Sequence, residues 1–300
     1  MYWSGYKLRR LGFIVLALIF VLIIQACKVG EEPSDDESEN VPPKEEAASK
    51  EEDQPDVNQR EVEETTINYD LDLSPFEREP SQWGENVDGV KTKMDTDEQQ
   101  IALTFDACGG PYGNGYDEEL ITYLLEAQIP ATLFVNQRWI DENEELFLML
   151  ADEPLFQIEN HGTQHVPLSV NGGTAWGIEA TESPKEAQQE VLGNHKRVYK
   201  LTGKEMSLFR SGTAYYDEVA VSLVEALGYE VVNFDILGDA GATFSKEQVT
   251  NALLQAQPGS IALLHMNQPQ SGTAGGVKEA VPLLKEQGFE FVQLQDVELK

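Results

Sequence analysis

The sequence predicts an α/β protein built on a parallel β-sheet. From about Gln99 onward, short apolar runs alternate with amphipathic stretches, and strands separated by helices favour parallel pairing. Seven candidate strands fall within about 200 residues, slightly fewer than the eight of the common α/β barrel. We therefore expect a small parallel barrel over residues 99–300, preceded by segments of a different character.

The first 27 residues have the pattern of an export signal. Lys7, Arg9 and Arg10 precede an apolar run over residues 11–24, and Cys27 follows. The run is short for a membrane span, which needs about 20 residues, but typical of a signal sequence. The ending is similar to a bacterial lipoprotein signal, in which the cysteine is lipidated; an uncleaved anchor helix is the alternative. Either arrangement predicts an extracytoplasmic protein tethered to the bacterial cell membrane.

Two further segments precede the barrel. Residues 28–66 are rich in Glu, Asp, Pro, Ser and Lys and almost free of large apolar side chains. Such a segment cannot bury enough surface to offset its ordering entropy, so we expect an acidic disordered linker. Residues 67–98 contain scattered charges and a few aromatic residues, and we expect an irregular lead-in that packs on the domain surface.

The order of elements in the body follows from the hydrophobic pattern. The candidate strands are residues 101–105, 131–135, 156–160, 207–210, 230–234, 260–265 and 289–294. The candidate helices are residues 117–128, 142–151, 183–202, 217–227, 246–256 and 274–287.

Polar residues stand at the ends of five of these strands. They are Asp106 after the first, His161 and His165 after the third, Arg210 at the fourth, Asp235 and Asp239 after the fifth, and His265 at the sixth. In a parallel barrel these carboxyl ends open on one face, where active sites are built. The pattern therefore predicts a functional rim.

The histidine pair is the sharpest signal within that rim. The chain has four histidines, and His161 and His165 are four residues apart. On a helical turn this spacing places both imidazoles on one face, where they can share a divalent metal ion. A pair of polar loop histidines without a ligand is the alternative.

Composition limits the choice of partners. The formal net charge of −32 disfavours binding to phosphate backbones, so we expect no nucleic acid partner. A neutral or weakly charged substrate fits better. Two cysteines are too few for a disulfide framework.

Taken together, the motifs resemble those of the polysaccharide deacetylases, the fourth carbohydrate-esterase family, over roughly residues 98–296. The family's Thr-Phe-Asp-Asp-Gly motif is matched by residues 104–107 with Ala107 in fourth place, and its His-Ser/Thr-x-x-His motif by residues 161–165 with Gly162 in second place. Arg210 opens the third motif, Asp235 or Asp239 is nearest to the fourth, and His265 ends the fifth, Leu-x-His.

The resemblance implies a distorted (β/α)7 barrel that hydrolyses N-acetyl groups of an amino-sugar-containing polysaccharide, such as a cell-wall or extracellular glycan, and releases acetate. It implies that His161 and His165 hold a divalent metal, zinc by preference. Asp106 is then the general base and His265 the general acid. Arg210 orients Asp106, and Asp239, or else Asp235, keeps His265 charged. The backbone N–H near Thr213 is the implied oxyanion donor.

Ala107 departs from the family pattern because a methyl group cannot ligate a metal, and a catalytic zinc site usually has three protein ligands. Four arrangements stay open. Cys108 supplies a thiolate, Asp106 itself binds the ion, water completes a two-histidine site, or the site is metal-poor and the domain binds carbohydrate without turnover. A buried thiol without a ligand role is the simplest interpretation of Cys108.

For some other residues the sequence gives weaker evidence of a role in the site. Asn267 lies in a long loop after His265 and is a candidate for binding sugar hydroxyls, although a solvated loop amide is the default interpretation. We expect His195 to be a surface histidine, and Trp139 and Trp176 to serve in packing rather than sugar stacking.

Overall fold

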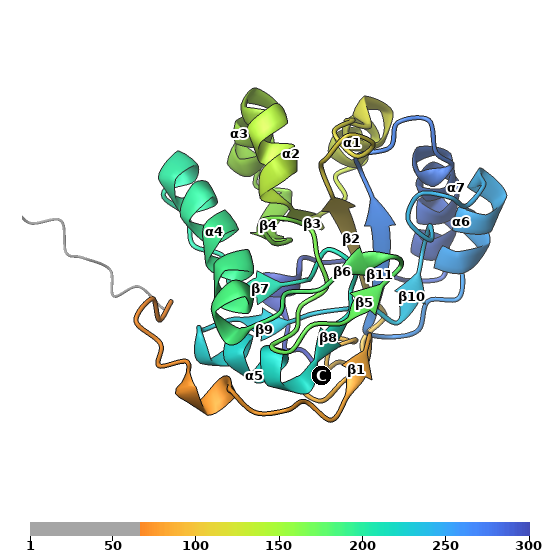
Figure 1. Cartoon of the computed structure of the whole chain (residues 1–300). Helices are drawn as coiled ribbons and strands as arrows, with labels where there is room; N and C mark the ends of the chain where they lie inside the picture. The colour runs from red at the N-terminus through yellow and green to blue at the C-terminus, as the bar shows by residue number, and fades with distance from the viewer. Residues whose placement is uncertain (1–66) are drawn as a thin grey trace, which may run out of the picture. The chain divides into compact units, whose positions relative to one another are not determined.

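The computed structural model describes residues 67–300 (Figure 1). The predicted signal, Cys27 and the acidic linker lie outside the described residues. Within residues 67–300, no helix combines the length and the apolar character that crossing a membrane requires.

A parallel sheet forms the centre of the domain. Its strands follow the spatial order β10 (Ile236–Leu237), β11 (Ser260–His265), β2 (Gln100–Ala107), β3 (Ala131–Val135), β4 (Phe156–Asn160), β7 (Leu208–Phe209) and β9 (Glu230–Val231). The short strand β12 (Glu290–Phe291) pairs with the beginning of β2. The sheet curls into a half-barrel of seven strands, which confirms the predicted distorted (β/α)7 fold.

Helices pack on the outside of the sheet (Figure 1). They are α1 (Glu118–Glu126), α2 (Gln137–Glu142), α3 (Glu144–Asp152), α4 (Pro184–Thr202), α5 (Glu218–Ala226), α6 (Lys246–Leu253) and α7 (Thr273–Glu286). Side-chain caps fix several of the starts. Asp117 caps α1, Ser183 caps α4 ahead of a proline, and Ser245 forms a capping box at α6.

The strand predictions were wrong at two places. The apolar run over residues 230–234 forms a strand only at β9, because Asn233 and Asp235 turn the chain through side-chain hydrogen bonds toward a separate short strand, β10. The strand predicted over 289–294 is limited to β12, and the 3-10 turn η2 (Leu294–Asp296) follows it. The seventh strand of the half-barrel is therefore β10.

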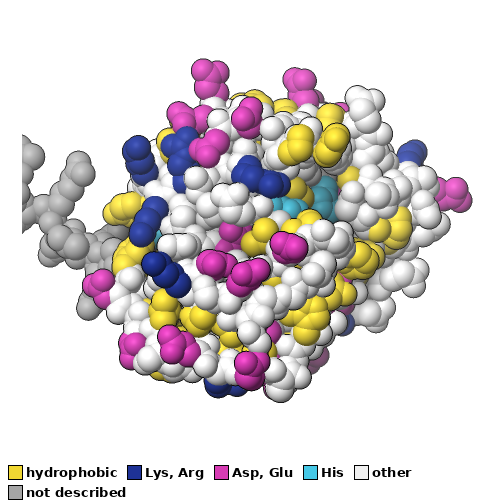
Figure 2. Space-filling model, in the orientation of Figure 1, with side chains coloured by type: hydrophobic (Ala, Val, Ile, Leu, Met, Phe, Trp, Pro, Cys, Tyr) yellow, Lys and Arg dark blue, Asp and Glu magenta, His cyan; other side chains and the backbone are white. Residues whose placement is uncertain are grey.

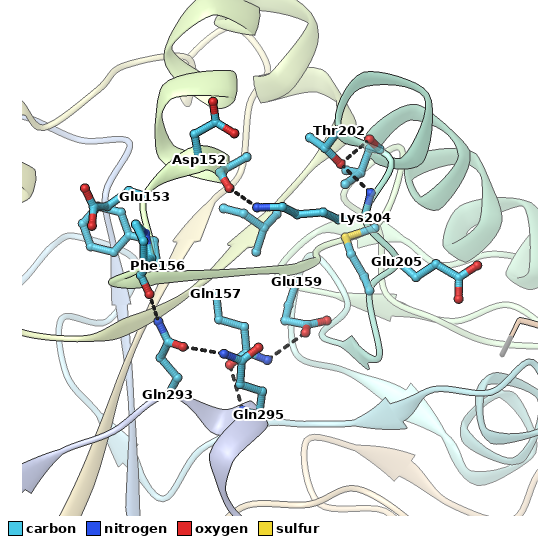
Figure 3. Close-up of a pocket in the computed structure, with 15 residues that line it drawn as sticks. Asp152, Glu153, Phe156, Gln157, Glu159, Thr202, Lys204, Glu205, Gln293 and Gln295 are labelled. Atoms are coloured by element: carbon cyan, nitrogen blue, oxygen red, sulfur yellow. Dashed lines mark hydrogen bonds between the residues drawn. The ribbon is translucent and has the colours of Figure 1, made fainter. Parts of the chain in front are cut away.

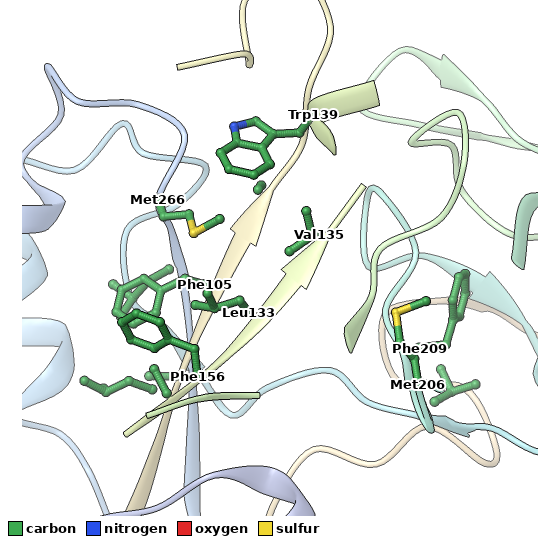
Figure 4. Close-up of a cluster of buried hydrophobic side chains, with 14 of the residues drawn as sticks. Phe105, Leu133, Val135, Trp139, Phe156, Met206, Phe209 and Met266 are labelled. Carbon is green, nitrogen blue, oxygen red and sulfur yellow. The ribbon is translucent and has the colours of Figure 1, made fainter. Parts of the chain in front are cut away.

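Alternating residues of the strands separate two apolar layers. In β2, Leu103, Phe105 and Ala107 belong to the large cluster between sheet and helices (Figure 4). Ala102 belongs to a smaller cluster inside the half-barrel, together with Phe134 of β3. Asp106 lies on the inner series, so the sheet's pleat directs its side chain toward the barrel axis.

The lead-in packs along the domain rather than extending away from it. It contains the 3-10 turn η1 (Ser74–Phe76) and strand β1 (Trp83–Gly84), which pairs antiparallel with β8 (Tyr216–Asp217). Single bridges then join Lys91 to Val232 and Lys93 to Ser260. A separate hairpin of β5 (Thr174–Ala175) and β6 (Ile178–Glu179) follows β4.

Candidate active site

The carboxyl ends of five parallel strands meet at one edge of the sheet, and the predicted polar residues lie there. Asp106 is in β2, His161 follows β4, Arg210 follows β7, Asp239 follows β10 and His265 ends β11. His265 and Asp106 are register partners on neighbouring strands. Figure 2 shows histidine atoms on the floor of a hollow in the surface.

Arg210 holds Asp106 in one orientation. Its Nη1 donates to Asp106 Oδ1 at 2.8 Å and to Thr104 Oγ1 at 2.9 Å. Nε and Nη2 donate to the backbone oxygens of Val232 and Asn233, both at 3.0 Å. The guanidinium is fully buried, and its hydrogen bonds leave it no alternative position. It therefore fixes one carboxylate oxygen of Asp106 and leaves the other facing the site.

Asp239 holds His265 in the same manner. One carboxylate oxygen accepts from His265 Nδ1 at 2.8 Å, and the other accepts from the His265 backbone N–H at 2.7 Å and from Thr273 Oγ1 at 2.8 Å. Burial by itself would lower the pKa of His265, but the charge and hydrogen bond of Asp239 raise that pKa well above its usual value. Asp239 therefore favours the charged imidazolium form of His265.

The two metal-binding candidates form a contact pair. The rings of His161 and His165 lie 5.0 Å apart at 85°. His161 Nδ1 lies 2.9 Å from the backbone oxygen of Arg210, a contact that places a proton on Nδ1 and directs Nε2 into the site. His161 Nε2 is 3.5 Å from Asp106 Oδ2. Burial would lower the pKa of His161, and the charge of Asp106 raises it above the usual value.

Cys108 adjoins this pair. Its Sγ lies 3.9 Å from His161 Nε2, and Cys108, His161 and His165 each offer a ligand atom within 4.8 Å of the others. Burial would raise the pKa of the thiol, but the charge of His165 and hydrogen bonds to the surrounding imidazoles lower that pKa well below its usual value.

These residues fit a divalent metal ion. His165 Nε2 is buried and has no hydrogen-bond partner, an arrangement that costs free energy unless a ligand satisfies the nitrogen. Two imidazoles and a thiol are also donors that transition metals accept. A small shift of the three side chains is enough to bring their ligand atoms within bonding distance of one shared ion.

Glu190 in α4 anchors the loop that carries both histidines. Its buried carboxylate accepts the backbone N–H groups of Thr163, Gln164 and His165 at 2.9 to 3.0 Å. His165 has a φ of +62°, a left-handed conformation that a residue with a side chain adopts only where its surroundings impose it. A Cβ at Gly162 would lie 2.4 Å from Glu190 Oε1. Glycine therefore fits this position, where the His-Ser/Thr-x-x-His motif has Ser or Thr.

Asparagine side chains also support this loop. Asn136, the N-cap of α2, donates through Nδ2 to the carbonyls of His161 and Gly162, both at 2.8 Å. Asn194 Nδ2 donates to Asn160 Oδ1 at 2.9 Å. The sequence analysis did not identify Glu190, Thr273 or these asparagines. The N-cap position of Asn136 gave no signal, because the sequence analysis predicted no helix beginning at residue 137.

The remaining predicted site residues have different surroundings. Thr213 lies in the loop after β7, and its Oγ1 is buried without a partner. Asn267 is 2% exposed and donates to the carbonyl of Gly113 at 2.8 Å, so the expectation of a solvated loop amide is wrong. Asp235 accepts from Ser260 Oγ and the Ile261 backbone at the other end of β11, away from His265.

His195 corrects a second expectation. It is fully buried on the inner side of α4, where Nδ1 contacts the hydroxyl of Tyr229, so the surface prediction is wrong. Its charged neighbours Lys196 and Arg197 suggested an exposed position, but the helix turns His195 inward. Trp139 is buried, as expected for a packing residue, with Nε1 donating to Gly115 O at 2.8 Å.

Trp176 lies in the turn of the β5–β6 hairpin and is 74% exposed, which corrects the expectation that packing is its role. Its ring contacts Tyr215 edge-on at 5.8 Å, and Tyr215 contacts Trp83 of β1 at 5.9 Å. Figure 1 shows this hairpin beside β8. We call these three residues the aromatic group. Tyr215 belongs to the loop that begins at Arg210, so the group adjoins the site.

A cavity of about 460 Å³ lies at the opposite edge of the sheet, near the beginnings of β4 and β7 (Figure 3). Its polar lining is already paired. Gln157 donates to Glu159 Oε1 at 2.8 Å, and the backbone N–H groups of Ser207 and Leu208 donate to Glu159 Oε2 at 3.0 and 2.7 Å. The catalytic chemistry therefore belongs to the other edge.

Comparison with known proteins agrees with this geometry. Residues 93–232 match the polysaccharide deacetylase family. A peptidoglycan-N-acetylmuramic acid deacetylase of Bacillus subtilis is 26% identical over 233 residues, which cover 73% of this chain and 81% of the relative.

Solved structures show the same fold. A family 4 carbohydrate esterase from Bacillus anthracis is 27% identical, with a TM-score of 0.54 over 70% of this chain and 86% of that chain. A family 4 pseudoenzyme from Bacillus anthracis is 18% identical, with a TM-score of 0.58 over 69% of this chain and 67% of that chain. The motifs, the fold and these matches identify residues 93–232 as a polysaccharide deacetylase domain, and the members of that family are hydrolases that act on N-acetyl amide bonds.

Proposed function

We propose that this protein removes N-acetyl groups from an amino-sugar-containing polysaccharide, with a cell-wall or extracellular glycan as substrate. One observation carries the proposal. Two differently charged groups, the Asp106 carboxylate held by Arg210 and the His265 imidazolium held by Asp239, stand on neighbouring strands beside an imidazole pair. Amide hydrolysis needs a base for water and an acid for nitrogen, and this rim presents both.

Two residues of the chain each carry out one of the two proton transfers. Asp106 takes a proton from the attacking water, whose oxygen bonds to the acetyl carbon. His265 then gives its proton to the amide nitrogen as the carbon–nitrogen bond breaks, and acetate and a free amine result. Arg210 keeps the Asp106 carboxylate aimed into the site. Asp239 keeps His265 charged until the proton is transferred.

A divalent metal, zinc by preference, fits between His161 and His165. The chemistry that such an ion supplies when bound is polarisation of the acetamide carbonyl and activation of the water. The loop around Thr213 lies beside these histidines, since a Cβ at Gly212 would come within 2.4 Å of the His165 backbone. A backbone N–H of this loop is the proposed donor to the oxyanion.

The aromatic group supports a glycan as substrate. Trp176, Tyr215 and Trp83 present apolar ring faces and edges next to the site, a surface on which sugar rings can pack. The name of the Bacillus subtilis relative specifies peptidoglycan, which favours a cell-wall polymer. Asn267 contributes less to substrate binding than its loop position suggested, because its amide nitrogen is committed to Gly113.

We also propose that the domain works outside the cytoplasm, tethered to the membrane through lipidated Cys27 or an uncleaved anchor. The support is the sequence alone: basic residues, an apolar run of signal length, and a cysteine after it. Metabolic labelling with a fatty-acid analogue tests it. Label on the wild-type chain and none on Cys27→Ser is the expected result, and label on both would exclude this lipidation site.

Acetate release tests the deacetylation. The purified chain is incubated with N-acetylated chitooligosaccharides and with muropeptides, in parallel with and without a chelator. We expect acetate release that the chelator abolishes and that added zinc restores. The matched control is His265→Gln, which removes the proton donor.

The competing function is carbohydrate binding without turnover, and Ala107 is the observation that favours it. Saturable binding of the same oligosaccharides, with no acetate above the His265→Gln background at any metal concentration, would establish the binding module and reject the hydrolase.

A further inference from the structure

We propose that Cys108 is the third protein ligand of the metal site, completing a set of one thiolate and the imidazoles of His161 and His165. The inference rests on the proposed metal-dependent function. It assigns to a cysteine the position that the family motif gives to the carboxylate replaced by Ala107. Three independent features of the described residues support it.

The first feature is the direction of the side chains along β2. Phe105 and Ala107 belong to the apolar cluster between sheet and helices, whereas Asp106 turns inward to Arg210. Ala107 is fully buried in that cluster. With this backbone, a carboxylate at position 107 would lose its water without gaining a cation, at a high free-energy cost. The next inward side chain after Asp106 belongs to Cys108.

The second feature is the distance between donor atoms. Cys108 Sγ is 3.9 Å from His161 Nε2, and the three ligand atoms lie within 4.8 Å of one another. Usual zinc–sulfur and zinc–nitrogen bonds arranged tetrahedrally place such atoms roughly 3.5 Å apart. Side-chain adjustments of about 1 Å or less close the set, and the fourth position remains for water or substrate.

The third feature is the set of hydrogen bonds that His161, His165 and Asp106 already make. His161 Nδ1 contacts a backbone oxygen, so Nε2 is the nitrogen that faces the site, and the buried His165 Nε2 makes no geometrically defined hydrogen bond. Asp106 has one oxygen committed to Arg210 and lies outside the group of mutually close ligand atoms. Cys108 as ligand therefore leaves Asp106 available as the base, whereas Asp106 as ligand would remove it.

Cobalt substitution of the full chain tests the ligand set directly. The protein is stripped with a chelator, loaded with Co²⁺ and examined by ultraviolet–visible absorption, in which a bound thiolate gives a sulfur-to-cobalt charge-transfer band. We expect the band in the wild type and its loss in Cys108→Ser. The matched control is Cys27→Ser, which removes the chain's other cysteine and should keep the band.

Metal affinity and thiol protection provide two further readouts. Cys108→Ser should weaken zinc binding by more than about tenfold, because even the loss of a residue that supports a ligand costs about 10–100-fold. In the wild type, zinc should slow alkylation of Cys108 by iodoacetamide by at least about tenfold, consistent with blocking of the thiolate nucleophile. This second measurement needs no variant, so it remains decisive if Cys108→Ser fails to fold.

A wild-type cobalt protein without the charge-transfer band, or a band that persists in Cys108→Ser, overturns the proposal. Equal alkylation rates with and without zinc overturn it as well. Acetate release measured on the same preparations separates the two hypotheses. A charge-transfer band without acetate release supports Cys108 as a ligand and rejects deacetylation. Zinc-dependent acetate release without the band supports deacetylation and rejects Cys108 as a ligand.

Discussion

At the scale of single residues, the site gives each of two neighbouring side chains a buried partner of different charge. Asp106 pairs with the cation of Arg210, and His265 pairs with the anion of Asp239. Both partners are fully buried, where a charge is tolerated because it is paired and hydrogen-bonded. The geometry thus pairs two neighbouring groups with partners of opposite charge.

Replacing the base tests this arrangement. Asp106→Asn keeps the shape and the hydrogen bond from Arg210 but cannot take a proton. We expect kcat for acetate release to fall by about 10²–10⁴-fold, the usual contribution of general base catalysis. The control, Asp97→Asn, removes an exposed carboxylate and should leave kcat unchanged. Activity of Asp106→Asn within a few-fold of the wild type would reject Asp106 as the base.

Glu190 holds the loop that carries the two proposed metal ligands, His161 and His165. Burial raises the pKa of its carboxyl group, and the backbone hydrogen bonds from the loop oppose that rise. Glu190→Gln replaces one acceptor oxygen by an NH₂ group facing backbone N–H donors. We expect zinc affinity to fall by about 10–100-fold, as for other residues that orient ligands. Isothermal titration of zinc measures this, with exposed Glu186→Gln of the same helix as control. Equal affinities would limit Glu190 to a structural role.

At the scale of elements, connections between the strands build the aromatic group. The β5–β6 hairpin places Trp176 in contact with Tyr215, and β1 brings Trp83 to the same ring from the lead-in. Three segments distant in sequence therefore form the aromatic group beside one catalytic rim. Such loops vary without disturbing the sheet, which explains how one fold accommodates different substrates.

Trp176→Ala tests the aromatic group. If sugar packing contributes as much as an aromatic pair, about 0.5–1.5 kcal/mol, KM for a long oligosaccharide should rise by about 2- to 12-fold. We expect kcat to change little, because the proton-transferring residues are untouched. Trp176→Phe should recover part of the loss. Tyr199→Ala, which removes another exposed aromatic side chain, is the control. Unchanged KM values in Trp176→Ala would exclude this surface from binding.

At the scale of the whole molecule, the lead-in is part of the fold. Glu218, at the start of α5, accepts from the backbone N–H groups of Ser81 and Gln82 at 2.8 and 2.9 Å. Burial would raise the pKa of Glu218, but these hydrogen bonds lower it to about 2. The free energy that they contribute depends on the charge of the carboxylate.

This linkage predicts a pH dependence of stability. Because the pKa of Glu218 in the folded protein is lower than its ordinary value of 4.5, the stabilisation is complete above pH 4.5 and is lost as the pH falls toward 2. Glu218→Gln should lower the free energy of unfolding by about 1–3 kcal/mol at pH 7, as for other hydrogen bonds to charged groups. Urea unfolding at several pH values measures the difference from wild type. The control is Glu225→Gln, which changes an exposed carboxylate of the same helix. This role would be contradicted if the loss of unfolding free energy in Glu218→Gln did not shrink below pH 4.5, or if Glu225→Gln lost as much.

The sequence by itself determined the elements and the residues of the rim. Apolar runs predicted five of the seven half-barrel strands closely, because buried parallel strands must be apolar on both faces. Polar residues at the ends of those runs located Asp106, His161 and His265, since the carboxyl ends of parallel strands open on one face of a barrel.

The tertiary structure alone decided which groups meet. Asp239 rather than Asp235 contacts His265, His195 is buried, Glu190 anchors the histidine loop, and Cys108 rather than Ala107 faces the imidazoles. Each of these outcomes depends on the direction of a side chain relative to residues far away in the chain. Local pattern gives the period of a strand or helix, but only the packed sheet and its connections fix which side faces the site.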